Sequence, residues 1–409
     1  MANINTLVLI GIGNIGLPVL EQLSLQEHNY SRIVMADSTH VVSATPIQKN
    51  LSQVLTAKKE GRRLDTLEGL EVEGIENLAN YFGREAVVIN ATPTQFTTEG
   101  MHYSVAYDFE ALERGSSVVT AHKTAFGGEH YNKLVETAAK NSAWYIPTGA
   151  IMAPTRVVEI LLFLRNEGIR IKSARGIVNG TDNYILSEMH NDKPKDEALR
   201  EAIDRGVAEP DPRDDLNGKD PYAKMKGLAM ICDNYCHSQG EVFGISDPRS
   251  GLPEVIRRRL DNNYKGIEGV TDELIAEIKA RGVLKLVGSY DSRRGIVQVG
   301  PQILDRSNPL SSVQGTQNML ILQLDDASID PIKMLIQIYT SITHHRNESE
   351  VKVRYRRSLD GSVIPQTHSI YTIKFSYHQP RELIIAGPGA GNAETAAALL
   401  LAAQKIKDN

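Results

Sequence analysis

A glycine-rich run near the start of the chain has the spacing of a phosphate-binding turn. It reads Gly-Ile-Gly-Asn-Ile-Gly over residues 11–16, directly after the short apolar segment Thr6–Ile10. In a strand, turn and helix unit, the first glycine makes the tight turn and the second lets backbone approach a pyrophosphate. The third permits close packing of the helix, whose first amides would hold the phosphates. The predicted cofactor contacts are Gly11, Gly13, Asn14, Ile15 and Gly16.

Asp37 is the residue that bears on the type of dinucleotide. It lies 21 residues after Gly16, at the end of a predicted second strand, where a carboxylate can accept hydrogen bonds from an adenosine ribose. This placement favours NAD, although Asp37 could instead only cap a turn. NADP is the alternative, because a basic group follows that could reach a 2′-phosphate if the acid turned away. That group is Lys49, Lys58, Lys59, Arg62 and Arg63.

Asp220 and Lys224 form a second pair with chemical potential. They are four residues apart, so on a helix they would share one face and could point at one substrate group. Asp220 followed by Pro221 is also a good helix cap and first helical residue. The two roles are compatible.

An acidic cluster just before this pair raises the question of a divalent metal. Asp211, Asp214 and Asp215 supply carboxylates, but two prolines interrupt them, and the spacing lacks the glycine turn and terminal glutamate of an EF-hand. We therefore expect no metal site here.

The segments around these residues resemble homoserine dehydrogenases. Residues 176–186 read G-I-V-N-G-T-D-N-Y-I-L, and residues 206–224 read G-V-A-E-P-D-P-R-D-D-L-N-G-K-D-P-Y-A-K. The family combines G-x-x-x-G-T-x-N-Y-I-L with G-x-A-E-x-D-P-x-x-D-x-x-G-x-D-x-x-x-K. Weaker similarities run from about residue 6 to residue 405, among them V-T-A-H-K-T at 119–124, Asn308-Pro-Leu with Asn318, and G-P-G-A-G-N-A-E-T at 387–395. The family's regulatory extension is not expected.

The resemblance implies hydride transfer between nicotinamide and homoserine or aspartate 4-semialdehyde, with Lys123 and Lys224 as candidate proton carriers. Desolvation or a neighbouring cation can suit a lysine to that task. Asp220 is the third expected catalytic residue. Glu209 is expected to bind the substrate ammonium, and Asp214 or Asp215 to orient the substrate. The remaining implied residues are Gly180, Thr181 and Tyr184 for substrate, and Ala91, Thr92, Lys123 and Gly391 for cofactor.

Two departures from the family pattern bear on the substrate. His122 stands where the family has the asparagine of V-T-A-N-K, and we expect a neighbouring role for it because Lys123 is kept. The family's glycine-rich crossing loop is Ala150–Pro154 here, and Ile146 or Pro147 replaces an upstream acid, so no monovalent cation is expected. A sister oxidoreductase acting on another amino-acid-derived alcohol or aldehyde is therefore the alternative. A nucleotide sensor would not need these lysines and acids.

The elements expected to carry these residues predict an α/β fold. Apolar strands at Thr6–Ile10, Ile33–Asp37, Ala86–Asn90 and Ser117–Thr120 alternate with helical sequence such as Tyr103–Arg114, as in a Rossmann-type doubly wound parallel sheet. After a strand at Ala143–Ile146 and a loop at Thr148–Pro154, an α+β domain with a mixed sheet should follow. Its expected elements are the helix Thr155–Asn166 and the strands Gly295–Gly300, Met319–Leu324 and Ile370–Tyr377.

The predicted domains are 1–150 for dinucleotide binding, 151–380 for substrate, catalysis and dimerisation, and 381–409 as a C-terminal helix returning to the first domain. Residues 343–366 are polar and basic, and we expect a solvated excursion. It holds His344, His345, Arg346, Arg354, Arg356 and Arg357.

Composition limits the partners. The 409 residues are 41% apolar and 23% charged with a net charge of -5, which favours neither disorder nor nucleic-acid binding. Cys232 and Cys236 suit reduced thiols, and the chain shows neither a secretory signal pattern nor an apolar run of membrane-spanning length. We expect a cytoplasmic homodimer acting on a small amino-acid substrate, without nucleic acid or membrane.

Overall fold

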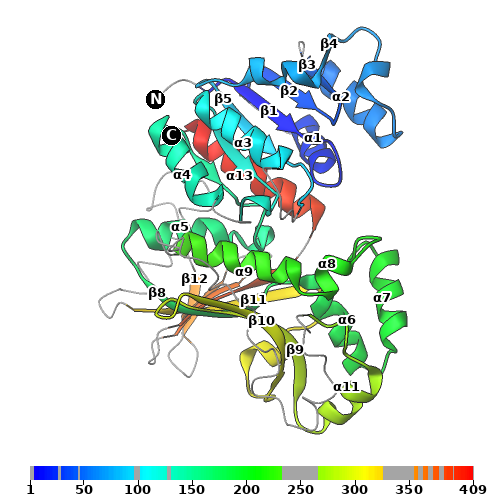
Figure 1. The fold of residues 1–409 in the computed structure, drawn as a ribbon, viewed down its shortest axis with the longest axis vertical. Coiled ribbons are helices and arrows are strands. Elements are labelled where there is room, and N and C mark those ends of the chain that lie inside the picture. Colours follow the sequence, from blue (N-terminus) through cyan, green and yellow to red (C-terminus); the bar gives the residue numbers. More distant parts are fainter. Residues whose placement is uncertain are drawn as a thin grey trace. The chain divides into compact units, whose positions relative to one another are not determined.

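The computed structural model divides into two compact units, which are described separately (Figure 1). Unit 1 is Met1–Ala153 with Gly391–Asn409, and unit 2 is Pro154–Ala390. The residues that the structure describes are 4–25, 29–44, 47–95, 102–126, 130–232, 266–325, 354–357, 363–366, 372–376, 382–389 and 391–408.

Unit 1 is built on a seven-stranded sheet of order β4-β3-β2-β1-β5-β6-β7 within the described residues. From β2 to β7 every pairing is parallel, as the strand and helix alternation predicts. β1 and β5 are buried along their whole length, because helices cover both faces of such a sheet. Two antiparallel strands at the edge, β3 and β4, were not predicted. The strands are β1 Thr6–Ile10, β2 Arg32–Ala36, β3 His40–Ala44, β4 Val72–Gly74, β5 Ala86–Asn90, β6 Ser117–Thr120 and β7 Tyr145–Ile146.

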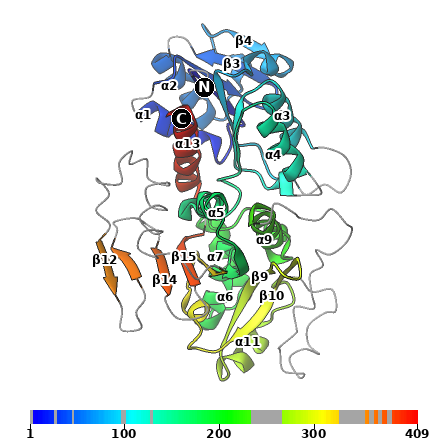
Figure 2. The same cartoon turned by 90° about the vertical axis from the view of Figure 1, so that its left-hand side faces the viewer.

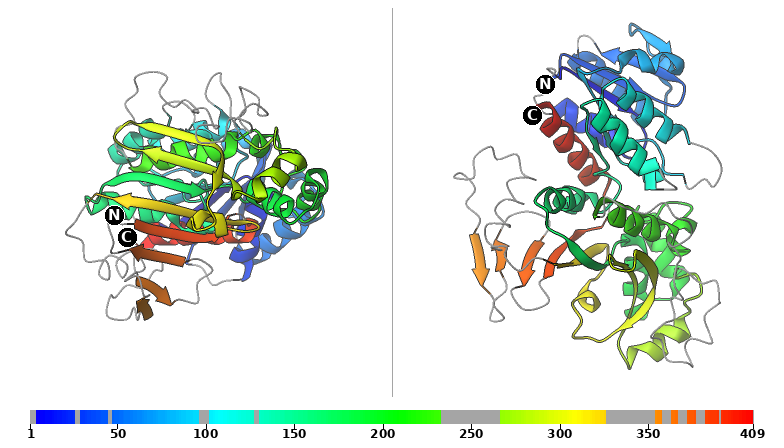
Figure 3. Two further views of the ribbon diagram at one scale, coloured as in Figure 1. Left: turned by 90° about the horizontal axis from the view of Figure 1, so that it is seen from below. Right: turned by 60° about the vertical axis from the view of Figure 1, so that its left-hand side comes forward.

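The C-terminal helix α13, Asn392–Asp408, belongs to unit 1. It packs on α1 and on β5 and β6, and Figure 3 shows it beside this sheet. Its Leu399 and Ala403 are fully buried in the same hydrophobic core as Leu7. The chain therefore completes its first core only at its end. The other helices of unit 1 are α1 Gly16–Leu25, α2 Ile47–Lys59, α3 Tyr103–Glu113 and α4 His130–Lys140, with short 3₁₀ turns η1 Leu64–Thr66, η2 Ile75–Tyr81, η3 Thr124–Phe126 and η4 Ala153–Thr155, the last of which crosses into unit 2.

Unit 2 is built on an eight-stranded sheet of order β10-β9-β8-β11-β15-β14-β13-β12 within the described residues. We predicted a mixed sheet, and its described pairings are all antiparallel. β15 lies in the segment 381–409 that was expected to be only the returning helix; its alternating burial suits a strand that is half covered. The strands are β8 Ile171–Ile177, β9 Val283–Asp291, β10 Ile296–Leu304, β11 Gln317–Leu324, β12 Arg354–Arg357, β13 Val363–Gln366, β14 Thr372–Ser376 and β15 Glu382–Pro388.

The helices of unit 2 place the two motif stretches, residues 176–186 and 206–224, over this sheet. α6 packs on β9 and β11, and α9 packs on β9 and β10 (Figure 2). The helices are α5 Val157–Asn166, α6 Gly180–His190, α7 Lys195–Asp204, α8 Arg213–Leu216, α9 Lys219–Cys232 and α11 Asp272–Lys279, with the 3₁₀ turn η5 Pro309–Ser312.

The polar stretch expected to be a solvated excursion contains the strands β12 and β13. Its residues His344, His345 and Arg346 lie outside the described residues, as does Cys236. Cys232, the last residue of α9, is half-buried. Among the helices that the structure describes, none combines the length and the apolar character needed to cross a bilayer.

Candidate active site

The glycine turn after β1 has the geometry that a dinucleotide requires. A side chain at Gly11, whose φ is +87°, would meet the Ala91 carbonyl oxygen at 2.8 Å, and one at Gly16 would meet the Gly11 carbonyl oxygen at 1.8 Å. Both positions therefore need glycine. Gly13 is exposed, and a Cβ built there meets nothing within 4 Å. Asn14 is exposed and Ile15 half-buried beside it, so the turn offers open backbone at the start of α1, which fits a phosphate group.

Asp37 lies directly after β2, as predicted, but it is already paired. Its Oδ2 is 2.6 Å from the Lys58 Nζ of α2, and its Oδ1 accepts hydrogen bonds from the backbone amides of Thr39 and His40, each at 2.9 Å. Burial alone would raise the pKa of Asp37, but these bonds outweigh it and lower the pKa to about 2. Both carboxyl oxygens of Asp37 thus have partners within the protein. Lys58, one of the basic residues considered for NADP, lies beside this acid.

The loops after β5 and β6 hold the predicted cofactor residues Ala91, Thr92 and Lys123. Ala91 and Thr92 are buried, and the Asn90 side-chain oxygen accepts from the Thr92 amide and hydroxyl, the latter at 2.6 Å. The Lys123 amide donates to Thr94 Oγ1 at 3.1 Å. The two loops are therefore joined to each other at the carboxyl ends of adjacent parallel strands, which is where such sheets bind ligands.

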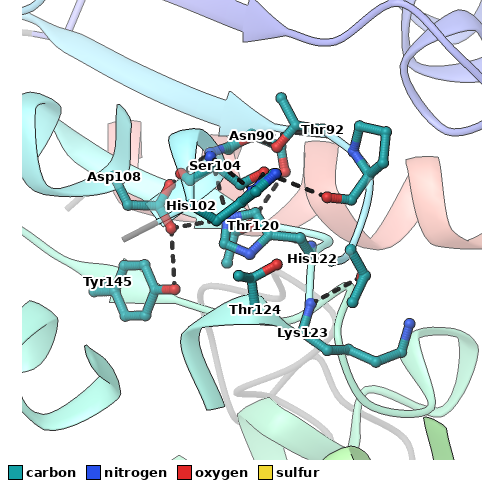
Figure 4. A network of polar contacts seen from close by, with 12 residues as sticks. Asn90, Thr92, His102, Ser104, Asp108, Thr120, His122, Lys123, Thr124 and Tyr145 are labelled. Atoms are coloured by element: carbon teal, nitrogen blue, oxygen red, sulfur yellow. Dashed lines mark hydrogen bonds and ion pairs between the residues drawn. The ribbon is translucent and has the colours of Figure 1, made fainter. Parts of the chain in front are cut away.

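His122, immediately before Lys123, is buried against Asp108 of α3, with 3.0 Å between His122 Nε2 and Asp108 Oδ2 (Figure 4). The Tyr145 hydroxyl donates to the same oxygen at 3.1 Å. Burial, followed by the Asp108 carboxylate, raises the pKa of Tyr145, which keeps its hydroxyl protonated as a donor. The sequence marked His122 as a departure, but it carried no signal for Asp108 or Tyr145.

In unit 2, the side chain of Asn179 contacts two of the predicted site acids at the start of α6. Its side-chain oxygen caps the helix by accepting from the Asp182 amide at 3.0 Å. Its side-chain nitrogen donates to Asp215 at 2.7 Å and to Asp220 at 2.8 Å. One asparagine thus brings the two motif stretches together, although neither the family pattern nor its spacing singled it out.

Asp220 and Lys224 lie on one face of α9, as their spacing predicted. Lys224 Nζ is 2.7 Å from Asp220 Oδ2, and both side chains are only 12% exposed, so solvent screens the pair weakly. The helix begins at Lys219, so Asp220 lies in its first turn and is not its cap. A lysine ammonium held by one oriented carboxylate is a suitable proton donor to a substrate oxygen.

Asp182 is a further acid at this place. It is fully buried in α6, and both of its carboxyl oxygens are without a hydrogen-bond partner among the described residues. Burial, followed by the nearby Asp215 and Asp220, raises the pKa of Asp182 well above its usual range. It occupies an unspecified position of the family motif, which is why the sequence did not single it out.

The other predicted substrate residues are spread around this cluster. Glu209 is exposed, and Asp214, also exposed, lies 3.5 Å from Lys219. Thr181 donates to the Val207 carbonyl at 3.1 Å, which ties α6 to the segment that carries Glu209. Two further residues of the prediction are oriented by packing. Tyr184 is buried under the Arg205 guanidinium and accepts from it at 3.1 Å, and a Cβ at Gly180 would lie 3.0 Å from the Thr316 carbonyl oxygen.

Lys285 of β9 is a buried cation that the sequence did not mark. Its Nζ donates to Asn183 Oδ1 at 2.8 Å and to the Val313 carbonyl, and it is fully buried. Burial lowers the pKa of Lys285 to about 8. Asn183 lies in the first turns of α6, next to Asp182. Its hydrogen bond with Lys285 therefore ties this part of α6 to β9.

The crossing loop contains a strained residue. Met152 is 2% exposed and has a φ of +43°, a left-handed conformation that a glycine would adopt without strain. Gly391, the last predicted cofactor residue, precedes α13 in unit 1 and its carbonyl accepts from the Thr395 amide at 2.9 Å.

The comparisons with known proteins agree with these motifs. The family model described as homoserine dehydrogenase matches residues 157–337. The homoserine dehydrogenase of Methanocaldococcus jannaschii is 25% identical over 324 residues, covering 77% of this chain and 85% of that protein. The chain is thus similar to homoserine dehydrogenases over most of its length, and the family model covers the part that carries both motif stretches.

Solved structures share the fold along nearly the whole chain. The homoserine dehydrogenase of Thermoplasma acidophilum has a TM-score of 0.63 at 18% identity, with 99% of each chain covered. A hyperthermophilic archaeal homoserine dehydrogenase in complex with NADPH has a TM-score of 0.62 at 18% identity, covering 98% of this chain and 96% of that one. The α/β fold with a mainly parallel first sheet is thereby confirmed. The homoserine dehydrogenase family consists of NAD(P)-dependent oxidoreductases.

Proposed function

We propose that this chain is an NAD(P)-dependent homoserine dehydrogenase that interconverts L-homoserine and aspartate 4-semialdehyde. The observation that carries the proposal is the Asp220 and Lys224 ion pair at 2.7 Å, held by Asn179 inside the segments that match the family pattern. In this arrangement the Lys224 ammonium can deliver a proton from a position fixed by Asp220.

The cofactor residues of the proposal are those of unit 1. Gly11, Gly13 and Gly16 form the turn that fits the pyrophosphate, with Asn14 and Ile15 at its tip. Asp37 accepts from the adenosine ribose, which favours NAD, and Lys58 beside it offers the positive charge that NADP would use. The bound nicotinamide supplies the hydride acceptor or donor. Ala91, Thr92, Lys123 and Gly391 complete the proposed contacts.

Proton transfer in the proposal falls to Lys224, with Lys123 as the second candidate. In the reducing direction the Lys224 ammonium donates a proton to the oxygen of the aldehyde, and Asp220 keeps that ammonium in position. In the oxidising direction the neutral amine accepts the hydroxyl proton. Asn179 fixes Asp220 throughout, since its amide donates to the carboxylate.

Substrate binding uses the acids near this pair. The substrate is a zwitterion, and its ammonium requires carboxylates that are not already neutralised. We assign Glu209 to the ammonium and Asp214 or Asp215 to its orientation, with Gly180, Thr181 and Tyr184 shaping the wall. No metal enters the proposal.

A direct assay tests the activity. We expect the purified protein to reduce NAD with L-homoserine faster than with other amino alcohols offered at equal concentration. A better rate with another amino alcohol would favour the alternative, a sister oxidoreductase of the same family, which the altered loop with Met152 supports. No turnover with any member of the panel would refute both.

Assembly and location are part of the proposal. A homodimer through the second sheet is supported by Ile321 of β11 and Ile384 of β15, which pair across the two strands and remain only half-buried on one face. Size-exclusion chromatography with light scattering would test it. The cytoplasm is the proposed compartment because the enzyme would draw on metabolic NAD(P) and its two cysteines suit reducing conditions. A small amino-acid substrate is the proposed partner, without nucleic acid or membrane.

A further inference from the structure

A set of buried polar side chains lies directly behind Lys123, and the proposed chemistry does not use it (Figure 4). At its centre is Asp108, which is fully buried in α3. Its Oδ1 accepts from the Asn90 side chain at 2.8 Å, and its Oδ2 lies 3.0 Å from His122 Nε2 and accepts from the Tyr145 hydroxyl at 3.1 Å. Asn90 of β5, His122 of the loop after β6 and Tyr145 of β7 thus all contact a single carboxylate of α3.

The contact with Asp108 orients the His122 ring. The carboxyl oxygens of Asp108 are acceptors, so the ring directs Nε2 toward them as a donor. Its Nδ1 has no partner among the described residues, although the ring is 1% exposed. A buried ring with one unpaired nitrogen is costly, and the contact with Asp108 is what holds it there.

The loop that carries Lys123 is also held by backbone hydrogen bonds. The Ala121 amide donates to the Asn90 carbonyl at 2.9 Å, the Lys123 amide to Thr94 Oγ1 at 3.1 Å, and the Phe126 amide to the Lys123 carbonyl at 3.0 Å. These bonds fix the backbone of the loop. The His122 ring adds a buried side-chain contact from this loop to Asp108 of α3, and Figure 4 shows the Lys123 side chain extending away from Asp108.

We propose that His122 is a positioning residue, whose ring, held on Asp108, fixes the loop from which Lys123 reaches its substrate. The proposal rests on the proposed function, in which Lys123 is one of two proton carriers. A lysine on a loosened loop would spend less time in the productive geometry, and misplacement by about 1 Å can cost turnover of order 10²-fold. Asparagine, which the related V-T-A-N-K segments have at this position, also carries an N–H donor that can reach toward a carboxylate.

The test compares His122→Ala and His122→Asn with a matched control, Tyr145→Phe. Tyr145 donates to the same Asp108 oxygen but is carried by β7 and not by the Lys123 loop, so its loss should disturb Asp108 without removing a side chain of that loop. For each variant, kcat and KM for L-homoserine, the cofactor dissociation constant from NADH fluorescence, and Tm are measured. Rates are normalised to the number of cofactor-binding sites, which removes any unfolded fraction.

We expect His122→Ala to lower kcat by roughly 10- to 100-fold while the cofactor dissociation constant stays within about twofold. His122→Asn should recover most of that loss, and Tyr145→Phe should lower Tm yet keep kcat within about twofold. If His122→Ala fails to fold, His122→Leu takes its place, because leucine fills the space without an N–H donor, and it should show the same loss.

Either of two results would overturn the proposal alone. One is an unaltered kcat in His122→Ala, or in His122→Leu where that is used, in an active wild-type background. The other is a loss of kcat in Tyr145→Phe as large as in the His122 variant, which would mark a role in stability only. A wild-type protein inert toward every amino alcohol would refute the proposed function and this proposal together.

Discussion

The cofactor turn of unit 1 and the acids at the start of α6 in unit 2 differ in how their charges are paired. At the turn, backbone geometry dictates glycine, and the nearby Asp37 carboxylate already has a lysine at 2.6 Å. In unit 2, Asp215 and Asp220 share one asparagine, one lysine serves Asp220, and the buried Asp182 has no hydrogen-bond partner among the described residues. At the first place the acid already has its counter-charge before a ligand arrives. The second place gathers three acids, and burial beside the other two raises the pKa of Asp182.

The largest effect is expected when the two lysines proposed to carry the proton are removed. Lys224→Ala and Lys123→Ala should each lower kcat by about 10²- to 10⁴-fold, the range typical of general acid and base groups, with cofactor affinity nearly unchanged. Steady-state rates and NADH fluorescence titration measure the two quantities. Lys219→Ala, which alters an exposed lysine of the same helix, is the matched control. Near-normal rates in both alanine variants would remove these residues from the mechanism.

The next effect concerns Asp37 and Lys58, the ion pair near the cofactor turn of unit 1. We expect wild type to prefer NAD(H), because Asp37 repels a 2′-phosphate, and Asp37→Ser to shift the ratio of kcat/KM toward NADP(H) by about tenfold, or 1.4 kcal/mol. Lys58→Ala should shift it the other way, since it unpairs the acid and removes a positive charge. The two cofactors are compared at fixed ionic strength. An Asp37→Ser variant indistinguishable from wild type would mean that Lys58 and its basic neighbours decide the preference.

A smaller effect is expected at the crossing loop. Met152→Gly should raise homoserine turnover a few-fold, because glycine relieves the left-handed backbone at φ +43° and the crowding of a buried side chain. With Ile146 and Pro147 in place of the family's acid, we expect the same rates in sodium, potassium or a bulky organic cation. Rates of both proteins in these salts are the measurement, with Met152→Leu as control. Strong sodium activation of wild type would show that the loop binds a cation after all.

The smallest effect is on stability and tests the raised pKa of the buried Asp182 in unit 2. The pKa of Asp182 is raised in the folded state, so folded protein binds its proton more tightly than unfolded protein. Its contribution to the free energy of unfolding is therefore fully present below the unfolded pKa near 3.8 and is lost as pH rises toward neutrality. Asp182→Asn should become increasingly more stable than wild type from pH 4 to pH 7 in urea unfolding. Asp214→Asn, at an exposed acid, is the control; an equal trend there, or none at Asp182, would contradict the prediction.

Local sequence determined the elements and the turn. The strands Ala86–Asn90 and Ser117–Thr120 have the predicted bounds, because short apolar runs between helices suit buried parallel strands. The need for glycine at Gly11 and Gly16 followed from the turn alone. The pairing of Asp220 with Lys224 followed from their spacing on one helix, since helical geometry places such side chains together wherever the helix lies.

Tertiary structure decided which distant residues meet. Nothing within the chain's local pattern indicates that Lys58 neutralises Asp37, that Asp108 meets His122, or that Asn179 bridges to Asp215 and Asp220, because each contact joins separate elements. The same holds for the edge strands β3 and β4, whose place depends on a sheet formed by other segments of the sequence. Periodicity reports which face of an element is apolar; only packing of one element on another fixes the partner of each polar group, and with it the burial and charge on which the proposed chemistry rests.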